Sequence, residues 1–319
     1  MSQSPQKNFA IIGVGGYIAP RHLKAIQDTG NRLIAATDPH DAVGVLDRFS
    51  FDVRFFTEYE RFDRHLDKLR RGPEESRVHY VSVCSPNYLH DSHMRMAMRA
   101  GADVICEKPL VINPWNLDAL QELERETGRR VSTVLQLRVH PQLMELQSKL
   151  QGGGRRHQVV LTYITSRGPW YNISWKGHDD RSGGIVTNIG IHFFDLLSWL
   201  FGTVQKSEVH VHEANRAAGA IELERADVTW YLSTESSDLP FTPQPGVKTT
   251  YRSITVDGTE IEFSEGFADL HTRIYEEVLA GRGFGIDVVR PSVELTSRIR
   301  SEKIAPARMG LHPRAAAHV

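Results

Sequence analysis

The sequence has few of the features that mark secreted or membrane proteins. Only two cysteines are present, Cys84 and Cys106, and both lie in apolar strand-like runs, which indicates buried reduced thiols rather than a disulfide framework. No segment approaches the roughly 20 consecutive apolar residues that span a bilayer, and the N-terminal residues lack the apolar run of an export signal. We therefore expect a cytoplasmic protein that does not enter a membrane.

An excess of charge of one sign is also missing. The 38 Lys and Arg residues nearly balance the 39 Asp and Glu residues, the formal net charge is −1, and the cations are scattered along the chain. A nucleic-acid partner or a charged membrane surface would require a clustered basic face, so neither partner is expected. The sequence contains 15 histidines, but none is paired with a cysteine at zinc-site spacing, and no metal is predicted.

Apolar residues make up 40% of the 319 positions, which is enough for more than one hydrophobic core and predicts two domains. Over residues 1–130, short apolar runs alternate with amphipathic helical stretches. This alternation predicts a parallel sheet covered on both faces, which is an α/β Rossmann domain. The expected strands are 9–12, 33–37, 53–56, 78–83, 104–106 and 131–135, and the expected helices are 21–29, 59–71, 91–100 and 114–127.

Residues 131–319 are predicted to form a second domain of the α+β class. The expected strands are 159–165, 204–213, 217–223, 227–234, 251–256 and 260–263. Asp257-Gly258 between the last two is typical of a two-residue hairpin turn. These strands predict a large, mainly antiparallel sheet with one open face. Helices are expected at 185–201, 269–280 and 292–300, and the tail after residue 306 is expected to be poorly ordered.

A glycine cluster follows the first predicted strand and leads into a helix. It contains Gly13, Gly15 and Gly16, followed by Tyr17 and Ile18. Glycine permits a sharp turn and the close approach of a pyrophosphate, and the N-terminus of a helix favours the negative phosphates. The spacing is one residue longer than in the usual dinucleotide-binding fingerprint. These five residues are assigned to a cofactor site.

Asp38 ends the second predicted strand, about 20 residues after the glycine cluster, where a carboxylate can accept hydrogen bonds from both ribose hydroxyls. The alternative interpretation is an ordinary turn residue at a strand end. A carboxylate here would repel the 2′-phosphate of NADP by several kcal/mol. No arginine stands beside Asp38 to reverse that effect, so the predicted cofactor is NAD.

Further loops lie at the carboxyl ends of predicted strands, where open α/β sheets bind their ligands. The residues assigned there to the cofactor site are Ser85, Pro86, Asn87, His90, Glu107, Lys108 and Gln136. A surface ion pair is the alternative interpretation for Glu107 and Lys108. Gln136, Arg138 and His140 alternate at the end of the sixth predicted strand, which would point all three toward the same edge.

Together these residues resemble the Gfo/Idh/MocA oxidoreductase family. The matching motifs are the glycine loop with His22 behind it, Asp38, Ser85-Pro86-Asn87 with His90, Glu107-Lys108-Pro109, and Gly183-Gly184 leading to Asn188, His192 and Asp195. The resemblance implies that Lys108 and His192 are catalytic and flank the reacting carbon at the nicotinamide. Asn188 is a departure, because many members have Asp at that position.

Longer segments resemble one branch of this family, the WlbA/WbpB branch; they are residues 16–22, 85–91, 161–168 and 251–258. The resemblance implies NAD-dependent oxidation of the C3 hydroxyl of UDP-N-acetylglucosaminuronic acid, within the biosynthesis of diamino-uronic sugars for lipopolysaccharide. It also implies a homotetramer that pairs subunits through the open face of the second sheet. For some members it implies 2-oxoglutarate as the oxidant that returns NADH to NAD.

Asn188, His192, Asp195 and Trp199 recur at helical spacing on one face of the predicted helix 185–201. Oxidation of an alcohol needs a base for the hydroxyl proton, and a neutral histidine suits that role near neutral pH. We favour His192 as the base and Lys108 as the cation that stabilises the developing alkoxide. Lys108 with a lowered pKa is the alternative base, and a buried structural network is the alternative for the polar stripe.

The stretch 167–177 is rich in cations and aromatic residues, which suits a UDP-sugar acid because its diphosphate and carboxylate need cations. The residues assigned to the substrate site are Lys108, Arg138, Tyr163, Arg167, Trp170, Tyr171, Trp175, Lys176, Asn188 and His192. An interface loop is the alternative for this stretch. For the whole chain, the alternatives are a dehydrogenase of a free sugar or inositol, and a non-catalytic NAD-binding regulator on the same fold.

Overall fold

The computed structural model describes residues 5–151, 154–244 and 246–319. Within them the chain forms two compact units. The first comprises Met1–Gln136 and Ala268–Arg290, and the second comprises Leu137–Phe267 and Pro291–Val319. The division expected from the sequence, 1–130 and 131–319, therefore differs from the structure in one main respect: a segment near the C-terminus returns to the first unit.

The first unit contains a six-stranded parallel sheet, as predicted for a Rossmann domain. Its strands are β1 (Asn8–Ile12), β2 (Arg32–Thr37), β3 (Arg54–Phe56), β4 (Tyr80–Val83), β5 (Asp103–Cys106) and β6 (Val131–Thr133). They lie in the order β3-β2-β1-β4-β5-β6, and every neighbouring pair is parallel. The central strand β1 is buried along its whole length, which explains the apolar run Phe9–Ile12.

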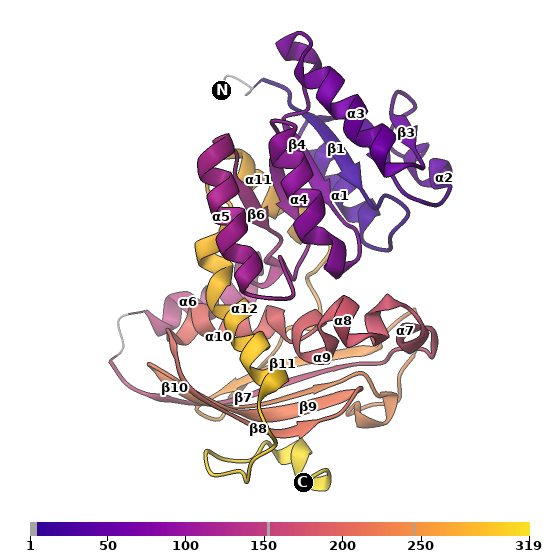
Figure 1. Cartoon of the computed structure of the whole chain (residues 1–319). Coiled ribbons are helices and arrows are strands. Elements are labelled where there is room, and N and C mark those ends of the chain that lie inside the picture. The colour runs from indigo at the N-terminus through magenta and orange to yellow at the C-terminus, as the bar shows by residue number, and fades with distance from the viewer. Residues whose placement is uncertain (1–4, 152–153, 245) are drawn as a thin grey trace. The chain divides into compact units, whose positions relative to one another are not determined.

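Helices connect these strands. They are α1 (Ala19–Asp28), α2 (Val43–Leu46), α3 (Tyr59–Arg70), α4 (His90–Arg99) and α5 (Trp115–Thr127), with 3₁₀ turns η1 (Glu74–Ser76) and η2 (Asn87–Leu89). The returning segment adds α11 (Leu270–Leu279), which packs against α1 and is drawn in yellow-orange beside the indigo and magenta elements (Figure 1). Thr272 on α11 donates a hydrogen bond to Asp28 on α1 at 3.0 Å.

The strand order of the first unit has its switch point between β1 and β4. The chain leaves β1 toward β2 on one side and leaves β4 toward β5 on the other, and open α/β sheets bind ligands outside the carboxyl ends of strands at such a point. Ile12 at the end of β1 pairs with Val83 at the end of β4. The glycine cluster and the loop that begins at Cys84 therefore start at the same level of the sheet.

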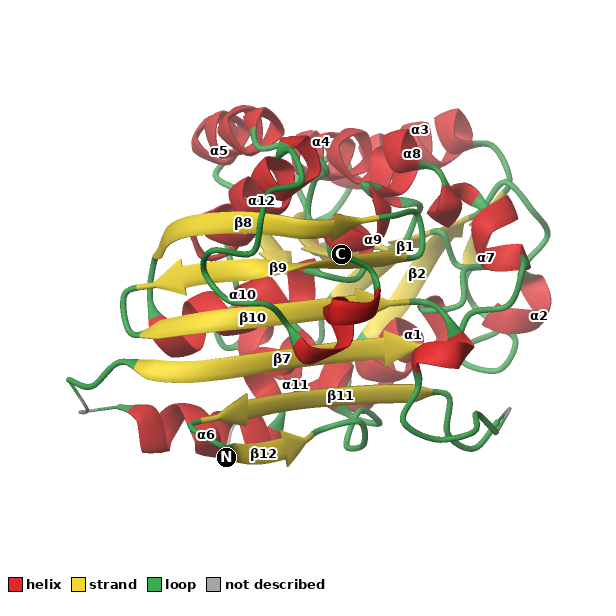
Figure 2. Cartoon of the chain, turned by 90° about the horizontal axis from the view of Figure 1, so that it is seen from below, coloured by secondary structure: helices red, strands yellow, loops and turns green. Residues whose placement is uncertain are grey.

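The second unit contains the large open-faced sheet that the sequence predicted. Its strands are β7 (His157–Thr165), β8 (Val204–His212), β9 (Arg216–Leu223), β10 (Ala226–Ser233), β11 (Thr250–Val256) and β12 (Thr259–Glu262). Their order is β12-β11-β7-β10-β9-β8 (Figure 2), and only β7 and β10 are parallel. Asp257 (φ 49°) and Gly258 (φ 84°) form the predicted hairpin turn, with both residues in the left-handed region.

Helices cover one face of this sheet (Figure 1). They are α6 (Pro141–Leu150), α7 (Trp170–Ile173), α8 (Asp179–Ser182), α9 (Gly184–Asn188) and α10 (Ile191–Phe201), with η3 (Gln136–Val139), η4 (Trp175–Gly177) and η5 (Ser236–Asp238) in the connections. Helix α12 (Ile286–Ser301) begins in the first unit and continues in the second from Pro291. The core of the second unit lies between α10 and the sheet, where Phe193, Leu197 and Trp230 are buried.

The predicted helix 185–201 is wrong in one respect, because it is two helices. The axis bends by 42° between Asp179–Asn188 and Ile191–Phe201. A side chain at Gly190 would meet the carbonyl oxygen of Val186 at 2.3 Å and Phe194 at 2.7 Å, so the chain passes too close to its neighbours there for any other residue. Among the described residues no single helix has the length and apolarity to cross a membrane; this bent pair passes by length and composition alone.

The expectation of a poorly ordered tail after residue 306 is also wrong. The 3₁₀ helix η6 (Pro313–Ala317) lies on the face of the sheet opposite the helices, over β10 and β7 (Figure 2). His312 is 1% exposed, stacks on Tyr231 at 5.4 Å between ring centres and lies 3.0 Å from the hydroxyl of Thr162. The tail carries few large apolar residues, and its burial depends on partners that are distant in sequence.

Candidate functional site

The glycine cluster and Asp38 come together at the crevice of the first unit. Oδ2 of Asp38 accepts a hydrogen bond from the backbone N–H of Gly15 at 2.9 Å, and Oδ1 accepts one from the N–H of His40 at 3.0 Å. The carboxylate is thereby fixed at the end of β2, beside the turn that precedes α1. This is the arrangement that a dinucleotide's adenosine ribose requires, because its hydroxyls need an acceptor next to the phosphate-binding turn.

The first glycine is required by the close approach of two strand ends. Gly13 has φ 84°, and a side chain on it would lie 2.8 Å from backbone atoms of Cys84 and Ser85. Tyr17 projects from the loop with 84% of its surface exposed, and Ile18 immediately precedes α1. The glycine turn thus leads directly into the N-terminus of α1, the end of a helix that favours phosphates.

The loops after β4 and β5 are joined by His90. Its Nδ1 lies 2.7 Å from the carbonyl oxygen of Pro109, and its Nε2 lies 2.8 Å from the carbonyl oxygen of Ser85. Burial lowers the pKa of His90, and the two carbonyl oxygens only partly offset that effect. The ring of His90 therefore lies between the two loops, and in its neutral form it donates to one of the two carbonyl oxygens. Its direct contact with a cofactor stays a prediction.

Ser85 and Asn87 lie at the same sheet edge and are buried. The hydroxyl of Ser85 lies 2.8 Å from Nδ1 of His93 on α4. Burial lowers the pKa of His93 to about 4, so the ring is neutral at pH 7. Together with Pro86, these residues lie at the carboxyl end of β4, which suits the cofactor role predicted for them.

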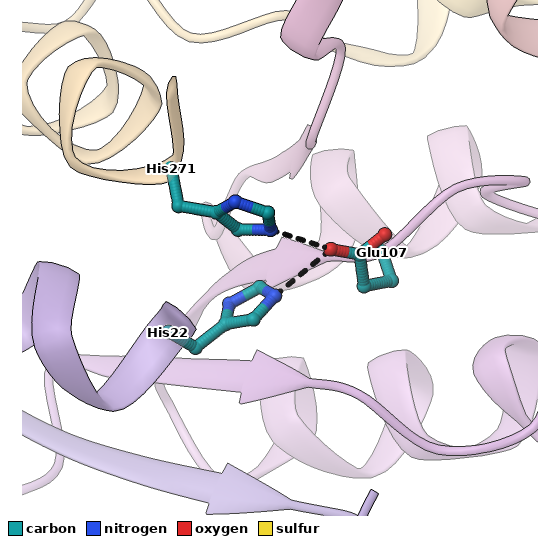
Figure 3. A group of neighbouring side chains, drawn as sticks. All are labelled: His22, Glu107 and His271. Carbon is teal, nitrogen blue, oxygen red and sulfur yellow. Dashed lines mark hydrogen bonds and ion pairs between the residues drawn. The ribbon is translucent and has the colours of Figure 1, made fainter. Parts of the chain in front are cut away.

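Glu107 is a buried carboxylate at the end of β5, held by two histidines (Figure 3). Nε2 of His22 on α1 and Nε2 of His271 on α11 each lie 3.0 Å from its Oε1. Burial alone would raise the pKa of Glu107, but the hydrogen bonds from these histidines hold it well below the usual range. The alternative of a surface ion pair with Lys108 is therefore excluded for Glu107, which is only 6% exposed.

The prediction that residues 136–140 continue a strand is wrong. β6 ends at Thr133, and Gln136–Val139 form a 3₁₀ turn, so alternate side chains no longer point the same way. Gln136 lies 3.4 Å from Nε2 of His271 in the first unit. Arg138 instead forms a bidentate ion pair with Asp195 of the second unit, at 2.8 and 2.9 Å. His140 lies 2.8 Å from the carbonyl oxygen of Glu265.

A group of predicted substrate residues comes together in the second unit. The amide of Asn188 donates to the hydroxyl of Tyr171 at 2.8 Å, and the guanidinium of Arg167 lies 5.8 Å from the centre of the Tyr171 ring. Burial and the charge of Arg167 both lower the pKa of Lys176. Among the described residues, no carboxylate forms an ion pair with Arg167 or Lys176, which leaves two neighbouring cations suited to an anion.

The other predicted substrate residues have different surroundings. Trp170 is 76% exposed, and Nζ of Lys176 lies 5.1 Å from the centre of the Trp175 ring. Tyr163 lies in the core, where its ring contacts Phe193 at 4.7 Å between centres. His192 is on α10, one turn before Asp195.

The sequence did not point to His271 or Tyr275 as members of the site. They lie on α11, more than 160 positions after Glu107, and their only local signal is a buried helical face shared with Ile274 and Val278. That pattern is typical of any amphipathic helix. Their partners became apparent only when α11 was seen to pack on the first unit.

Family models and solved structures of known proteins match most of the chain. Residues 7–134 match the model of the GFO_IDH_MocA oxidoreductase family, NAD-binding Rossmann fold, and residues 154–260 match the model of that family's C-terminal alpha/beta domain. Two crystal structures of the WlbA (WbpB) dehydrogenase from Thermus thermophilus are 49% identical to the chain, with a TM-score of 0.92. Each match covers 97% of this chain and 99% of the Thermus thermophilus chain. One holds NAD and alpha-ketoglutarate, and the other holds NAD and UDP-GlcNAcA.

More distant relatives share the fold. The WlbA dehydrogenase from Bordetella pertussis has 20% identity and a TM-score of 0.74, covering 93% of this chain and 95% of the other. Among curated proteins, the inositol 2-dehydrogenase of Rhizobium meliloti is 26% identical over 197 residues, which is 61% of this chain and 54% of the relative. The matched region thus spans about half the length of that relative.

Proposed function

Because the chain belongs to the Gfo/Idh/MocA oxidoreductase family, we propose that it oxidises the C3 hydroxyl of UDP-N-acetylglucosaminuronic acid to a 3-keto sugar with NAD. The observation that carries this proposal is the 49% identity, over nearly the whole chain, to a dehydrogenase that was crystallised with NAD and UDP-GlcNAcA. The carboxylate of Asp38, fixed beside the glycine turn, supports NAD over NADP. The paired cations Arg167 and Lys176 support a substrate with several negative charges.

Different residues of the chain accept the proton, stabilise the developing charge and bind the substrate. Bound NAD supplies the acceptor for the hydride that leaves C3. His192 takes the proton of the C3 hydroxyl, and Lys108 stabilises the negative charge that develops on the oxygen. Lys108 as the base is the alternative. Asn188 and Tyr171 form a hydrogen-bonded pair that orients polar groups toward the sugar, and Arg167 with Lys176 binds the diphosphate or the carboxylate.

We extend the proposal to the protein's setting. Recycling of NADH by reduction of 2-oxoglutarate is supported by the relative crystallised with NAD and alpha-ketoglutarate. Two free, buried cysteines suit the cytoplasm. The resemblance to this branch supports a homotetramer and a place in lipopolysaccharide biosynthesis, where an aminotransferase would consume the keto product.

The proposal is tested by mixing the protein, at a concentration comparable to that of the substrate, with NAD and UDP-GlcNAcA. We expect a rise in absorbance at 340 nm, a product lighter by two hydrogens, and transfer of deuterium from C3-labelled substrate to NADH. His192→Ala and Lys108→Ala should bind NAD normally and lose turnover. Reduction of NAD by myo-inositol but not by any UDP-sugar acid would favour the inositol dehydrogenase alternative. No reduction by any alcohol would favour a regulator.

A further inference from the structure

The buried carboxylate of Glu107 is one end of a longer chain of polar side chains in the first unit. Nδ1 of His22 lies 2.8 Å from the hydroxyl of Tyr275, which in turn lies 2.6 Å from the hydroxyl of Ser82 on β4. His22 and Ser82 have no exposed surface, and His271 is 2% exposed. Burying so many polar groups costs free energy unless each forms a hydrogen bond. This row of hydrogen-bonded side chains therefore has a role beyond packing.

The donors and acceptors along this chain can be assigned. Glu107 is ionised and only accepts, so Nε2 of both histidines must carry a hydrogen. Burial lowers the pKa of His22, which makes its ring neutral and its Nδ1 an acceptor. Tyr275 therefore donates to His22, and Ser82 donates to Tyr275. Nδ1 of His271 has no hydrogen-bond partner among the described residues, so the direct link of this ring to Glu107 is through Nε2.

These contacts hold the turn that follows β5. The second carboxylate oxygen of Glu107, Oε2, accepts the backbone N–H of Lys108 at 3.2 Å. On the far side of Lys108, the carbonyl oxygen of Pro109 is held by His90 at 2.7 Å. The backbone on both sides of Lys108 thus has a side-chain partner. Glu107, which the two histidines hold, lies before it, and the carbonyl oxygen of Pro109, next to His90, lies after it.

His22, Glu107 and His271 are also residue types that bind metal ions, and their ligand atoms lie within 4.8 Å of one another. Ligand atoms about 2.0–2.1 Å from a tetrahedral ion are about 3.3 Å apart. The two nitrogen–oxygen distances here are 3.0 Å, which is typical of hydrogen bonds. The geometry therefore favours a hydrogen-bonded clamp over a metal centre.

We propose that His22 and His271 are positioning residues for the reaction: by clamping Glu107 they hold residues 107–109 in one conformation, so that Lys108 meets the reacting hydroxyl in a fixed orientation. The proposal rests on the proposed function only in the role of Lys108. The ordering of the turn is a separate consequence, and it can be measured without any substrate.

The test compares two substitutions of His271. Gln places an amide N–H close to the position of Nε2 and should keep the bond to Glu107, whereas Leu has similar bulk and no donor. In His271→Leu we expect kcat to fall about ten- to a hundredfold, with smaller changes in KM and in NAD affinity. Hydrogen exchange of the amides of Glu107, Lys108 and Leu110 should speed up, because the turn opens more often. His271→Gln should restore both.

The pH dependence gives a further readout. The titratable groups around Glu107 are His22, Cys84, His90, Cys106, His271 and Tyr275, with Lys108 next in the chain. Removing a donor from Glu107 makes it easier to protonate. Loss of kcat through protonation of Glu107 should therefore set in at higher pH in His271→Leu than in the wild type or in His271→Gln.

His210 provides a matched control, because it is a buried histidine of the second unit that lies 3.3 Å from Glu208. His210→Leu and His210→Gln should leave kcat and exchange at 107–110 unchanged. If His271→Leu fails to fold, His271→Asn replaces it, because its shorter amide cannot reach Glu107.

Several outcomes would overturn the proposal. They are wild-type kcat and exchange in His271→Leu, equal losses in the Leu and Gln variants, and a stoichiometric metal whose chelation abolishes activity. Failure of the proposed function looks different: the wild-type protein would be inactive with UDP-GlcNAcA, while the exchange comparison would still show whether the clamp orders the turn.

Discussion

Substitution of Asp38 by Ala should reverse part of the protein's preference between NAD and NADP. The structure fixes this carboxylate with two backbone N–H groups, at 2.9 Å from Gly15 and 3.0 Å from His40, and leaves it less than a tenth exposed. It therefore cannot swing away from a cofactor without breaking both hydrogen bonds. Any phosphate on the adjacent ribose would meet a fixed negative charge.

The magnitudes follow from that geometry. Loss of a charge-assisted hydrogen bond to the ribose costs about 1.5–3 kcal/mol, so NAD should bind about ten- to a hundredfold more weakly. Two unit charges 4 Å apart repel by about 4 kcal/mol at an effective dielectric of ~20. Removing this repulsion should tighten NADP binding at least tenfold, even after the loss of hydrogen bonds near the ribose.

The assay is a titration of protein fluorescence with NAD and NADP, at low and at high salt. Asp41→Ala is the matched control, because it removes the same charge from an exposed position three residues away. That variant should leave both dissociation constants near the wild-type values. Unchanged affinities in Asp38→Ala, or equal effects in the two variants, would refute the assignment of Asp38 to the ribose site.

Two other predictions concern the second unit. Arg167→Ala should weaken UDP-GlcNAcA binding about ten- to a hundredfold and leave NAD affinity intact. Arg167→Lys should recover only part of the lost affinity, because an ammonium lacks the bidentate geometry of a guanidinium. Calorimetric titration measures both affinities, and unchanged sugar binding in Arg167→Ala would make this residue structural. Burial and the nearby Arg314 lower the pKa of His312 to about 4, so its undocked form binds more protons and docking weakens as pH falls below 6.5. At pH 5 the loss is about 2 kcal/mol, and residues 306–319 should become more sensitive to protease than at pH 7; equal cleavage at both values would contradict this.

The sequence by itself determined the elements whose signals are local. Gly13 before α1 and the Asp257-Gly258 turn follow from backbone conformations that few residues allow, and Asp38 is a single residue at a strand end. The alternation of strands and helices predicted the Rossmann fold, because parallel strands need helical crossovers. The motif around Glu107 and Lys108 was recognisable because its residues are consecutive in the sequence.

Only the tertiary structure decided which distant groups meet. α11 returns to the first unit and brings His271 to Glu107, and no local pattern announces such a return. The segment that suits a continuous helix is divided at 189–190, where Phe194 and Leu232 leave no room for a side chain at Gly190. The C-terminal tail is ordered because the sheet supplies partners for His312. In each case the deciding interaction joins residues that lie on different elements, where sequence periodicity carries no information.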